Sequence, residues 1–211
     1  MAVITVTTEN DSTNENDGVT SLREAIQVAA VLDGPDTIVF APDVETVSFN
    51  NDIVIGQTGL TIDGDKDGDG LADVTLSGGG QTELFFWSSG SSGTMRALTI
   101  ADGRGEDIDG SGPGGSGVGQ TAAISNRGEL LMERVVFTNN VQTSGSGQNG
   151  QNGSNGGSGR DGANGTISSA TGKPGSDGGN GGNSPVGGGD GGYATVLDNR
   201  AGGTLTLRDV A

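Results

Sequence analysis

The first residues of the chain alternate between apolar and polar side chains. Ile4 and Val6 alternate with Thr5 and Thr7, which predicts a β-strand with one buried face. Further short runs rich in β-branched and aromatic residues follow, each bounded by turn-forming residues. They lie at residues 36–40, 46–49, 53–55, 60–62, 74–76 and 84–87. The regular spacing of these runs predicts a chain built mostly of short strands.

One segment after the first strand has a helical period instead. Ser21 and Glu24 form a capping box, in which Ser21 accepts a hydrogen bond from the amide of residue 24 and Glu24 reaches back. The apolar residues that then fall on one face are Leu22, Ala25, Ile26, Ala29 and Ala30. Gly34 and Pro35 end this helix, and no second helix is expected.

An internal repeat emerges once two glycine-rich stretches, 103–119 and 141–192, are set aside. Three segments then align, with Trp87, Ile124 and Leu197 at one matched position and Ile100, Phe137 and Val210 at another. Without the glycine-rich stretches the repeat is about 20 residues long. So short a unit cannot bury its own inward side chains, and stacking on its neighbours has to create the core.

The expected fold class is therefore all-β, a β-solenoid of parallel strands in which the helix caps the first repeat. Asn126 and Asn199, at equivalent turns, are expected to form a side-chain ladder and to tolerate left-handed backbone. Both glycine-rich stretches leave the repeat at nearly the same point, so they are expected to project from one corner. A β-sandwich with long loops is the alternative.

This interpretation divides the chain into six parts. They are 1–35 with the first strand and capping helix, 36–102 with the first repeats and the acidic loop 63–73, the short insertion 103–119, the repeat 120–140, the long insertion 141–192, and the repeat 193–211, whose C-terminal end is open. The open end is interpreted either as the end of a fragment of a longer solenoid or as an edge that pairs with another copy.

The long insertion has a period of its own. Glycine recurs at every third position from Gly147 to Gly165, and in a second phase from Gly172 to Gly181. Period three matches polyproline II geometry, and prolines are too few for collagen. A lateral bundle of polyglycine-II-like segments is expected, with a disordered flexible insertion as the alternative.

Composition excludes several classes of chemistry. The 211 residues include 43 glycines but no cysteine or histidine, which removes disulfides, thiolate metal sites and Ser-His-Asp catalysis. A formal net charge of −17 argues against nucleic acid and anionic membranes as partners and favours divalent cations. The start of the chain lacks the features of a signal peptide, which indicates a cytoplasmic protein or one exported without an N-terminal signal. The acidic, cysteine-free composition favours the second, so an extracellular or cell-surface location is expected.

A family resemblance adds to this picture. The segment Thr20-Ser-Leu-Arg-Glu-Ala-Ile26, followed by Asp36-Thr-Ile-Val-Phe40, resembles the SLREAI motif that opens many secreted right-handed parallel β-helix proteins of bacteria. The glycine- and asparagine-containing repeats are similar to those of polymorphic outer-membrane-protein-like and RTX-type adhesins. The resemblance implies a right-handed parallel β-helix within a large exported protein, often secreted by the type I route. The nonapeptide repeats of RTX proteins are absent here.

The strongest local motif is an acidic loop. Its carboxylates are Asp63, Asp65, Asp67, Asp69 and Asp73. Counted from Asp63, acidic residues at positions 1, 3 and 5 and glycine at 6 match the first half of an EF-hand-like calcium loop. Asp73 at position 11 resembles the ending of the dockerin and thrombospondin type 3 loops. The predicted cofactor is Ca²⁺, held by these five residues; a solvated turn is the alternative.

These features favour an extracellular structural or adhesive module stabilised by calcium, with a surface glycan or neighbouring copies of itself as partner. A polysaccharide lyase or epimerase acting on acidic glycans is one alternative, with Asp102, Asp107, Asp109, Arg127 and Arg200 as candidate groups. Exposed aromatics suited to sugar binding are scarce, however, and a glycine-rich insertion holds catalytic carboxylates poorly. An ice- or surface-binding protein is a third possibility; it would need a flat array of Thr or Asn.

Overall fold

The computed structural model describes residues 1–106, 121–143 and 196–211, and the structural statements below refer to these residues. They contain one helix and fourteen strands. In chain order these are β1 (Val3–Val6), α1 (Leu22–Val31), β2 (Thr37–Phe40), β3 (Thr46–Ser48), β4 (Ile53–Ile55), β5 (Leu60–Asp63), β6 (Val74–Ser77), β7 (Phe85–Trp87), β8 (Ser92–Ala101), β9 (Arg104–Glu106), β10 (Ile124–Asn126), β11 (Glu129–Thr138), β12 (Val141–Thr143), β13 (Leu197–Asn199) and β14 (Thr204–Arg208).

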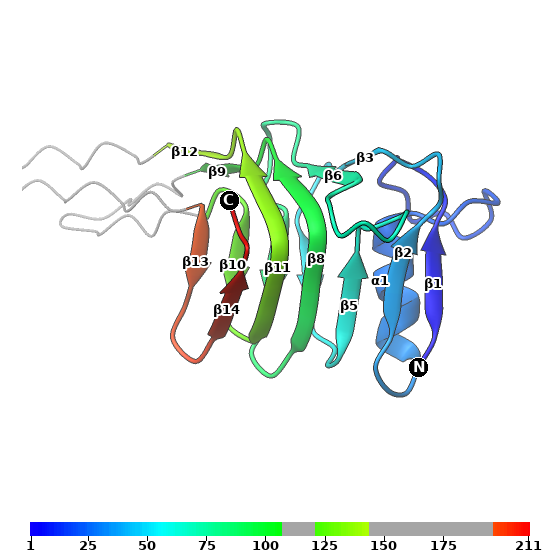
Figure 1. Cartoon of the computed structure of the whole chain (residues 1–211), viewed down its shortest axis with the longest axis horizontal. Helices are drawn as coiled ribbons and strands as arrows, with labels where there is room; N and C mark the ends of the chain where they lie inside the picture. Colours follow the sequence, from blue (N-terminus) through cyan, green and yellow to red (C-terminus); the bar gives the residue numbers. More distant parts are fainter. Residues whose placement is uncertain (107–120, 144–195) are drawn as a thin grey trace, which may run out of the picture.

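The strands form parallel sheets that face each other. The main sheet has the order β1-β2-β5-β8-β11-β14, with β3 and β6 beside it, and the second sheet has the order β13-β10-β7-β4. Every strand pair within them is parallel. From β4 onward the chain alternates between the two sheets, and we call each pass, such as β7 with β8, a repeat. The prediction of a mostly β chain with parallel sheets and one short helix is confirmed (Figure 1).

The helix closes one end of this stack. Ser21 accepts a hydrogen bond from the Glu24 amide, and the Glu24 carboxylate accepts one from the Ser21 amide, so the predicted capping box is present. Arg23 donates to the carbonyls of residues 51 and 52, just before β4, the last strand of the second sheet. The helix lies beside β1 and β2 at the N-terminal end of the molecule (Figure 1). Ala30, predicted to face the core, is exposed.

The core lies between the two sheets. Inward residues of both, such as Trp87 and Met95, are fully buried. Phe49 and Phe85 meet edge to face, with ring centroids 5.5 Å apart and planes inclined by 74°. A column of fully buried residues continues from β8 to β11, where Met132 pairs with Met95. Burial in this core therefore depends on contacts between repeats, as the sequence predicts.

The repeat alignment predicted from sequence is correct in part. Two predicted pairs are present, Ile124 with Leu197 and Ile100 with Phe137. Trp87, however, pairs with Asn126 instead of Ile124. The connections between the two strands of a repeat explain this shift. They span residues 88–91 and 200–203 in two repeats but only 127–128 in the repeat between them, so the register changes by two across the turn.

The two glycine-rich stretches leave from one corner, as predicted. Ala101 pairs with Thr138 at the ends of β8 and β11, and the next residues form β9 and β12, which pair in parallel. The remainder of both insertions, including the glycine tract with its predicted polyglycine-II-like structure, lies outside the described residues. Only the starting point of the insertions is therefore tested by the structure.

A second corner interrupts the strands of the main sheet. Ala97 in β8, Arg134 in β11 and Asp209 after β14 each have left-handed backbone, with φ of 49°, 52° and 51°. They occupy one column, because Arg96 pairs with Glu133 and Glu133 pairs with Arg208 just before them. The left-handed conformation turns the strand sharply at this point. One repeat earlier, β5 and β6 pair with the two halves of β8 and take the place of a single long strand.

Candidate metal centre

The acidic loop is inserted at this second corner. It joins β5 to β6. At the equivalent position of the later repeats, a single left-handed residue connects the two halves of the strand. The Gly64 amide donates to the Arg96 carbonyl at 3.0 Å, and the Asp73 amide donates to the Gly64 carbonyl at 3.2 Å, which closes the loop at its base. A Cβ atom on Gly64 would overlap the carbonyl oxygen of Ala97, so only glycine fits at this close approach.

Three carboxylates converge within the loop. Asp65, Asp67 and Asp73 each offer one carboxylate oxygen, and these oxygens lie within 4.8 Å of one another. Asp65 and Asp73 are half-buried, whereas Asp67 is exposed. Hard divalent cations prefer oxygen ligands of this type, so the group could hold a metal ion.

Backbone amides fix the carboxylates in place. The two carboxylate oxygens of Asp65 accept hydrogen bonds from the amides of Gly68 at 2.7 Å and Gly70 at 3.0 Å. Asp73 accepts one from the Lys66 amide at 2.7 Å. Gly68 and Gly70 both have left-handed backbone, with φ of 83° and 84°, which glycine adopts without steric cost. The loop is therefore wound around Asp65.

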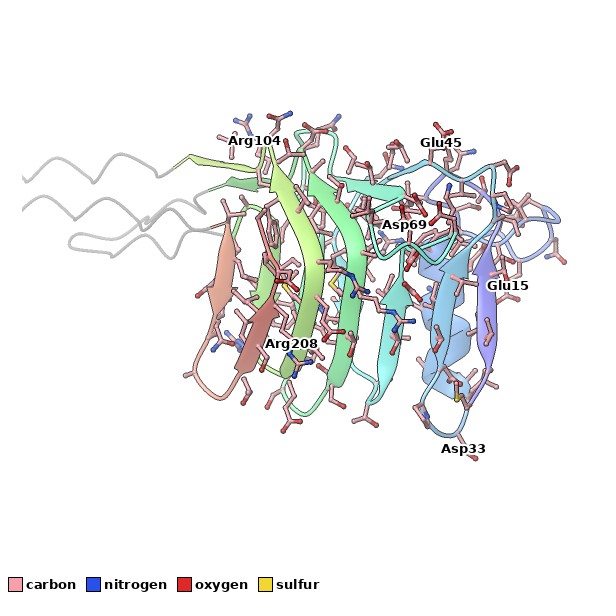
Figure 2. All side chains as sticks on the ribbon, in the orientation of Figure 1. Glu15, Asp33, Glu45, Asp69, Arg104 and Arg208 are labelled. Carbon is pink, nitrogen blue, oxygen red and sulfur yellow. The ribbon has the colours of Figure 1, made fainter. Side chains whose placement is uncertain are left out.

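The other two predicted ligands, Asp63 and Asp69, lie outside the group of three. The buried Asp63 carboxylate pairs with the Arg96 guanidinium at 2.5 Å. This hydrogen bond is the main reason why the pKa of Arg96 is raised above its usual value. Asp69, which is labelled in Figure 2, accepts a hydrogen bond from the Leu71 amide at 2.7 Å. The ion pair was not apparent from sequence, because it depends on the register between repeats.

Positive groups anchor the loop on both sides. The Lys66 ammonium donates to the carbonyls of Pro42 at 3.2 Å and Val44 at 3.0 Å, in the turn between β2 and β3. On the other side the Arg134 side chain approaches Gly70, where an added Cβ would lie 3.5 Å from Arg134 Nε. The loop is thus held between the corner of the preceding repeat and the corner of a later one.

The described candidates for polysaccharide chemistry do not meet. Asp102 follows the end of β8 and accepts a hydrogen bond from the Ser77 hydroxyl at 3.1 Å. Arg127 precedes β11 and lies over the Phe86 ring, while Arg200 pairs with Asp198 at 2.8 Å. Asp102 follows the C-terminal end of β8, whereas Arg127 precedes the N-terminal end of β11, which pairs with β8 in parallel, so the two residues lie at opposite ends of these strands. Asp107 and Asp109 lie outside the described residues.

Glu83, a carboxyl that sequence reasoning did not single out, has an unusual environment. Burial raises the pKa of Glu83 to about 7, against opposing effects of hydrogen bonds to Ser125 and of the Arg200 charge. Its Oε1 is buried without a hydrogen-bond partner. Ser125, which donates to Thr121 at 2.9 Å, is itself fully buried. No local sequence signal marks Glu83, because its neighbours come from other repeats.

No protein-family model, curated protein or solved structure matches this chain. Within the described residues, no helix has both the length and the apolar character needed to cross a membrane. The function has therefore to be inferred from the geometry of the chain itself.

Proposed function

We propose that the chain is a structural or adhesive module, a right-handed β-solenoid that acts outside the cell and is stabilised by calcium. The single observation that carries the proposal is the parallel register that continues from repeat to repeat. Phe85, Ile124 and Leu197 pair in one sheet, while Met95, Met132 and Leu207 pair in the other. Parallel crossovers are almost always right-handed, which supports that hand for the coil. A stack of this kind is a stiff spacer or display surface.

The loop geometry supports a calcium loop whose position 1 is Asp65, two residues later than Asp63, the position 1 predicted from the sequence. Counted from Asp65, the proposed ligands are Asp65, Asp67 and Asp73 at positions 1, 3 and 9, with Gly70 at 6 and the Leu71 carbonyl at 7. Asp69, at position 5, lies outside the group of three carboxylates. This count leaves Asp63 to its ion pair with Arg96. Position 6 does not distinguish the two counts, because Gly70 in this count and Gly68 in the other both have left-handed backbone. Ca²⁺ accepts six to eight oxygens in flexible geometry, and water would complete the set.

Calcium would give the corner a mechanical role. Like-charged carboxylates repel one another across short distances, and a bound divalent cation removes that repulsion. The loop contacts the turn before β3 through Lys66 and approaches β11 through Arg134. A metal ion that rigidifies the loop would therefore clamp successive repeats together.

Isothermal titration calorimetry with CaCl₂ and MgCl₂ tests this site. We expect a Ca²⁺ binding heat that Mg²⁺ does not reproduce, and its loss in the variant Asp65→Asn/Asp67→Asn. Asp33→Asn/Glu15→Gln is the matched control, since it also removes two charges and both residues are exposed and lie outside the loop (Figure 2). Unchanged binding in the double variant would remove calcium from the proposal.

The adhesive role is tested separately. We expect the purified chain to bind a surface glycan on an array, or to form filaments visible by negative-stain electron microscopy, in a calcium-dependent manner. Monomers that bind no glycan with or without calcium would contradict adhesion and leave only a spacer role. The resemblance to secreted bacterial adhesins supports this choice of assays.

A second candidate function, binding to a regular surface such as ice, is favoured by one specific column. Thr37, Thr61 and Thr94 stand in register on neighbouring strands of the main sheet, and Thr206 continues the column after Leu131. Strand spacing repeats hydroxyls at about 4.8 Å. Measurement of thermal hysteresis tests this function, and its absence at high protein concentration would exclude ice as the surface.

A further inference from the structure

The helix α1 has a second stripe of side chains, on the side opposite its core-facing apolar residues. Its members recur at i, i+3, i+4 and i+7, the spacing that places side chains on one helix face. They are Glu24, Gln27, Val28 and Val31. Val28 is 44% exposed and Val31 is 83% exposed. Because valine is a weaker helix former than alanine, these two residues stabilise the helix itself less than alanine would. The stripe therefore has the character of a contact surface.

A pocket of about 280 Å³ lies along this stripe. Glu15, from the loop that precedes α1, completes the lining and is exposed at the end of the molecule that the helix closes (Figure 2). Two hydrogen bonds fasten the loop to the rest of the chain. The Thr7 amide donates to the Thr20 carbonyl at 2.8 Å, and the Ser21 hydroxyl donates to the Ser12 carbonyl at 2.6 Å. The pocket is smaller than most small-molecule sites, which suits a single long side chain.

One wall of this pocket is a buried carboxylate with an unpartnered oxygen. Glu24 is only 6% exposed, and its Oε2 accepts from the Ser21 amide at 2.8 Å. Its Oε1 is buried and has no hydrogen-bond partner. An unpartnered buried charge is costly, so such an oxygen marks a place that lacks a donor. Arg23, the nearest cation along the helix, already pairs with Asp11 at 2.7 Å.

We propose that this pocket, which we call the amine pocket, binds a lysine side chain of a partner protein. The alkyl stem would pack on Val28 and Val31, and the ammonium would face Glu15 with the Glu24 charge behind it. Of the described residues that line the pocket, none carries a positive charge, so the charges of pocket and ligand are complementary. The N-terminus of α1 has a partial positive charge of about half a unit, which the two carboxylates outweigh. This binding is independent of calcium and of glycans.

The chain has few lysines of its own to offer to another copy. Lys66 donates to the carbonyls of Pro42 and Val44 and anchors the acidic loop. The other lysine, Lys173, lies outside the described residues. A separate protein is therefore the proposed source of the lysine, and a second copy is one outcome of the test.

Titrations of the full ¹⁵N-labelled chain followed by NMR test the proposal. The probes are N-acetyl-lysine methylamide and N-acetyl-norleucine methylamide, which share an alkyl stem and differ in the ammonium. We expect the lysine probe to shift the amides of Gln27, Val28 and Val31. It should bind about fivefold more tightly than the norleucine probe at low salt. This preference should vanish at about 0.5 M NaCl, because salt screens the ion pair.

Two variants separate the acidic part of the pocket from its apolar part. Glu15→Gln should remove the preference for lysine and leave norleucine binding unchanged, while Val31→Thr should weaken both probes. Both residues are exposed, so the fold should persist. Glu45→Gln and Val54→Thr are the matched controls at exposed positions outside the pocket, and they should bind both probes as wild type does.

Several results would overturn the proposal. They are equal affinity for the two probes, a preference for lysine that survives Glu15→Gln, and the absence of any shift in the α1 amides at tens of millimolar lysine probe. Tighter binding of putrescine than of the lysine probe would assign the pocket to a free polyamine and reject a protein partner. Self-association in analytical ultracentrifugation that Lys173→Gln abolishes would assign the pocket to a second copy and equally reject a separate partner.

Discussion

The side-chain amide of Asn126 donates a hydrogen bond to the side-chain oxygen of Asn199, one repeat further along the stack, at a distance of 2.7 Å. The same amide group donates to the Thr204 carbonyl at 3.1 Å, and its oxygen accepts from the Gly128 amide at 3.0 Å. The predicted asparagine ladder is thus present. Neither residue uses the left-handed backbone that asparagine tolerates, because neither has a positive φ.

This ladder makes Asn126 a sensitive point for stability. Asn126→Ala leaves buried backbone groups without partners, and we expect it to lower the free energy of unfolding by about 2–3 kcal/mol. Urea denaturation followed by circular dichroism measures this loss. Asn16→Ala is the control, because Asn16 is exposed. Equal stability of the two variants would show that the ladder contributes nothing net.

The two possible registers of the calcium loop make opposite predictions. With Asp65 as first ligand, wild-type protein gains about 2.7 kcal/mol at a free Ca²⁺ concentration one hundred times Kd. Asp65→Asn should gain almost nothing. Asp63→Asn should keep the full gain, although its metal-free stability falls because Arg96 loses its partner. Thermal unfolding with Ca²⁺ and with EDTA distinguishes the cases, and a lost gain in Asp63→Asn would restore the register that starts at Asp63.

Glu83 predicts a pH dependence with a definite sign. The pKa of Glu83 is raised from 4.5 to about 7, mainly by burial, so the folded state binds this proton more tightly than the unfolded state. Its contribution to stability is full below pH 4.5 and is lost as the pH rises through about 7. Glu83→Gln should therefore gain stability relative to wild type between pH 5 and pH 8.

Urea midpoints at the two pH values check this prediction, and Glu15→Gln, at an exposed carboxyl, is the control. The difference between Glu83→Gln and wild type should grow with pH, while Glu15→Gln should follow wild type. A constant difference across this range would mean that Glu83 titrates as an ordinary carboxyl.

The helix cap gives a further prediction. Ser21 is fully buried, accepts from the Glu24 amide at 3.1 Å and donates to the Ser12 carbonyl at 2.6 Å. We expect Ser21→Ala to cost about 1–2 kcal/mol and Ser21→Thr, which keeps the hydroxyl, to cost less. Amide hydrogen exchange should show the loss first in α1 and in β1 and β2 beside it. Unaltered exchange there would mean that the cap is dispensable.

Local patterns were enough to predict the helix and most strands, because capping boxes and alternation act over a few neighbouring residues. Features that depend on register were not predictable in the same way. Because the turn at residues 127–128 is shorter than its equivalents, Trp87 pairs with Asn126 and not with the predicted Ile124. The pairing of Asp63 with Arg96 likewise depends on the register between neighbouring repeats. The left-handed corner at Ala97 has no sequence signal, since alanine rarely adopts this backbone.

For the acidic loop the motif indicated the segment in which Asp65, Asp67 and Asp73 converge, but it left the starting position ambiguous. Alternating aspartates at positions 63, 65, 67 and 69 allow two counts, each with glycine at position 6. The contacts of Asp63 with Arg96 and of Asp65 with two loop amides separate these counts. Such contacts arise from the neighbouring repeat and from the wound loop, and neither can be inferred from spacing alone.

The corner that accepts the acidic loop has a consequence for engineering. One repeat joins its half-strands through residues 64–73, whereas the following repeats use Ala97 and Arg134 alone, and the sheet stays in register in every case. The same backbone junction therefore accommodates either a single left-handed residue or the whole loop of residues 64–73. Foreign sequences grafted at residues 97 and 134 would be displayed on the neighbouring strands β8 and β11, so the distance between strands would set the spacing of the displayed peptides.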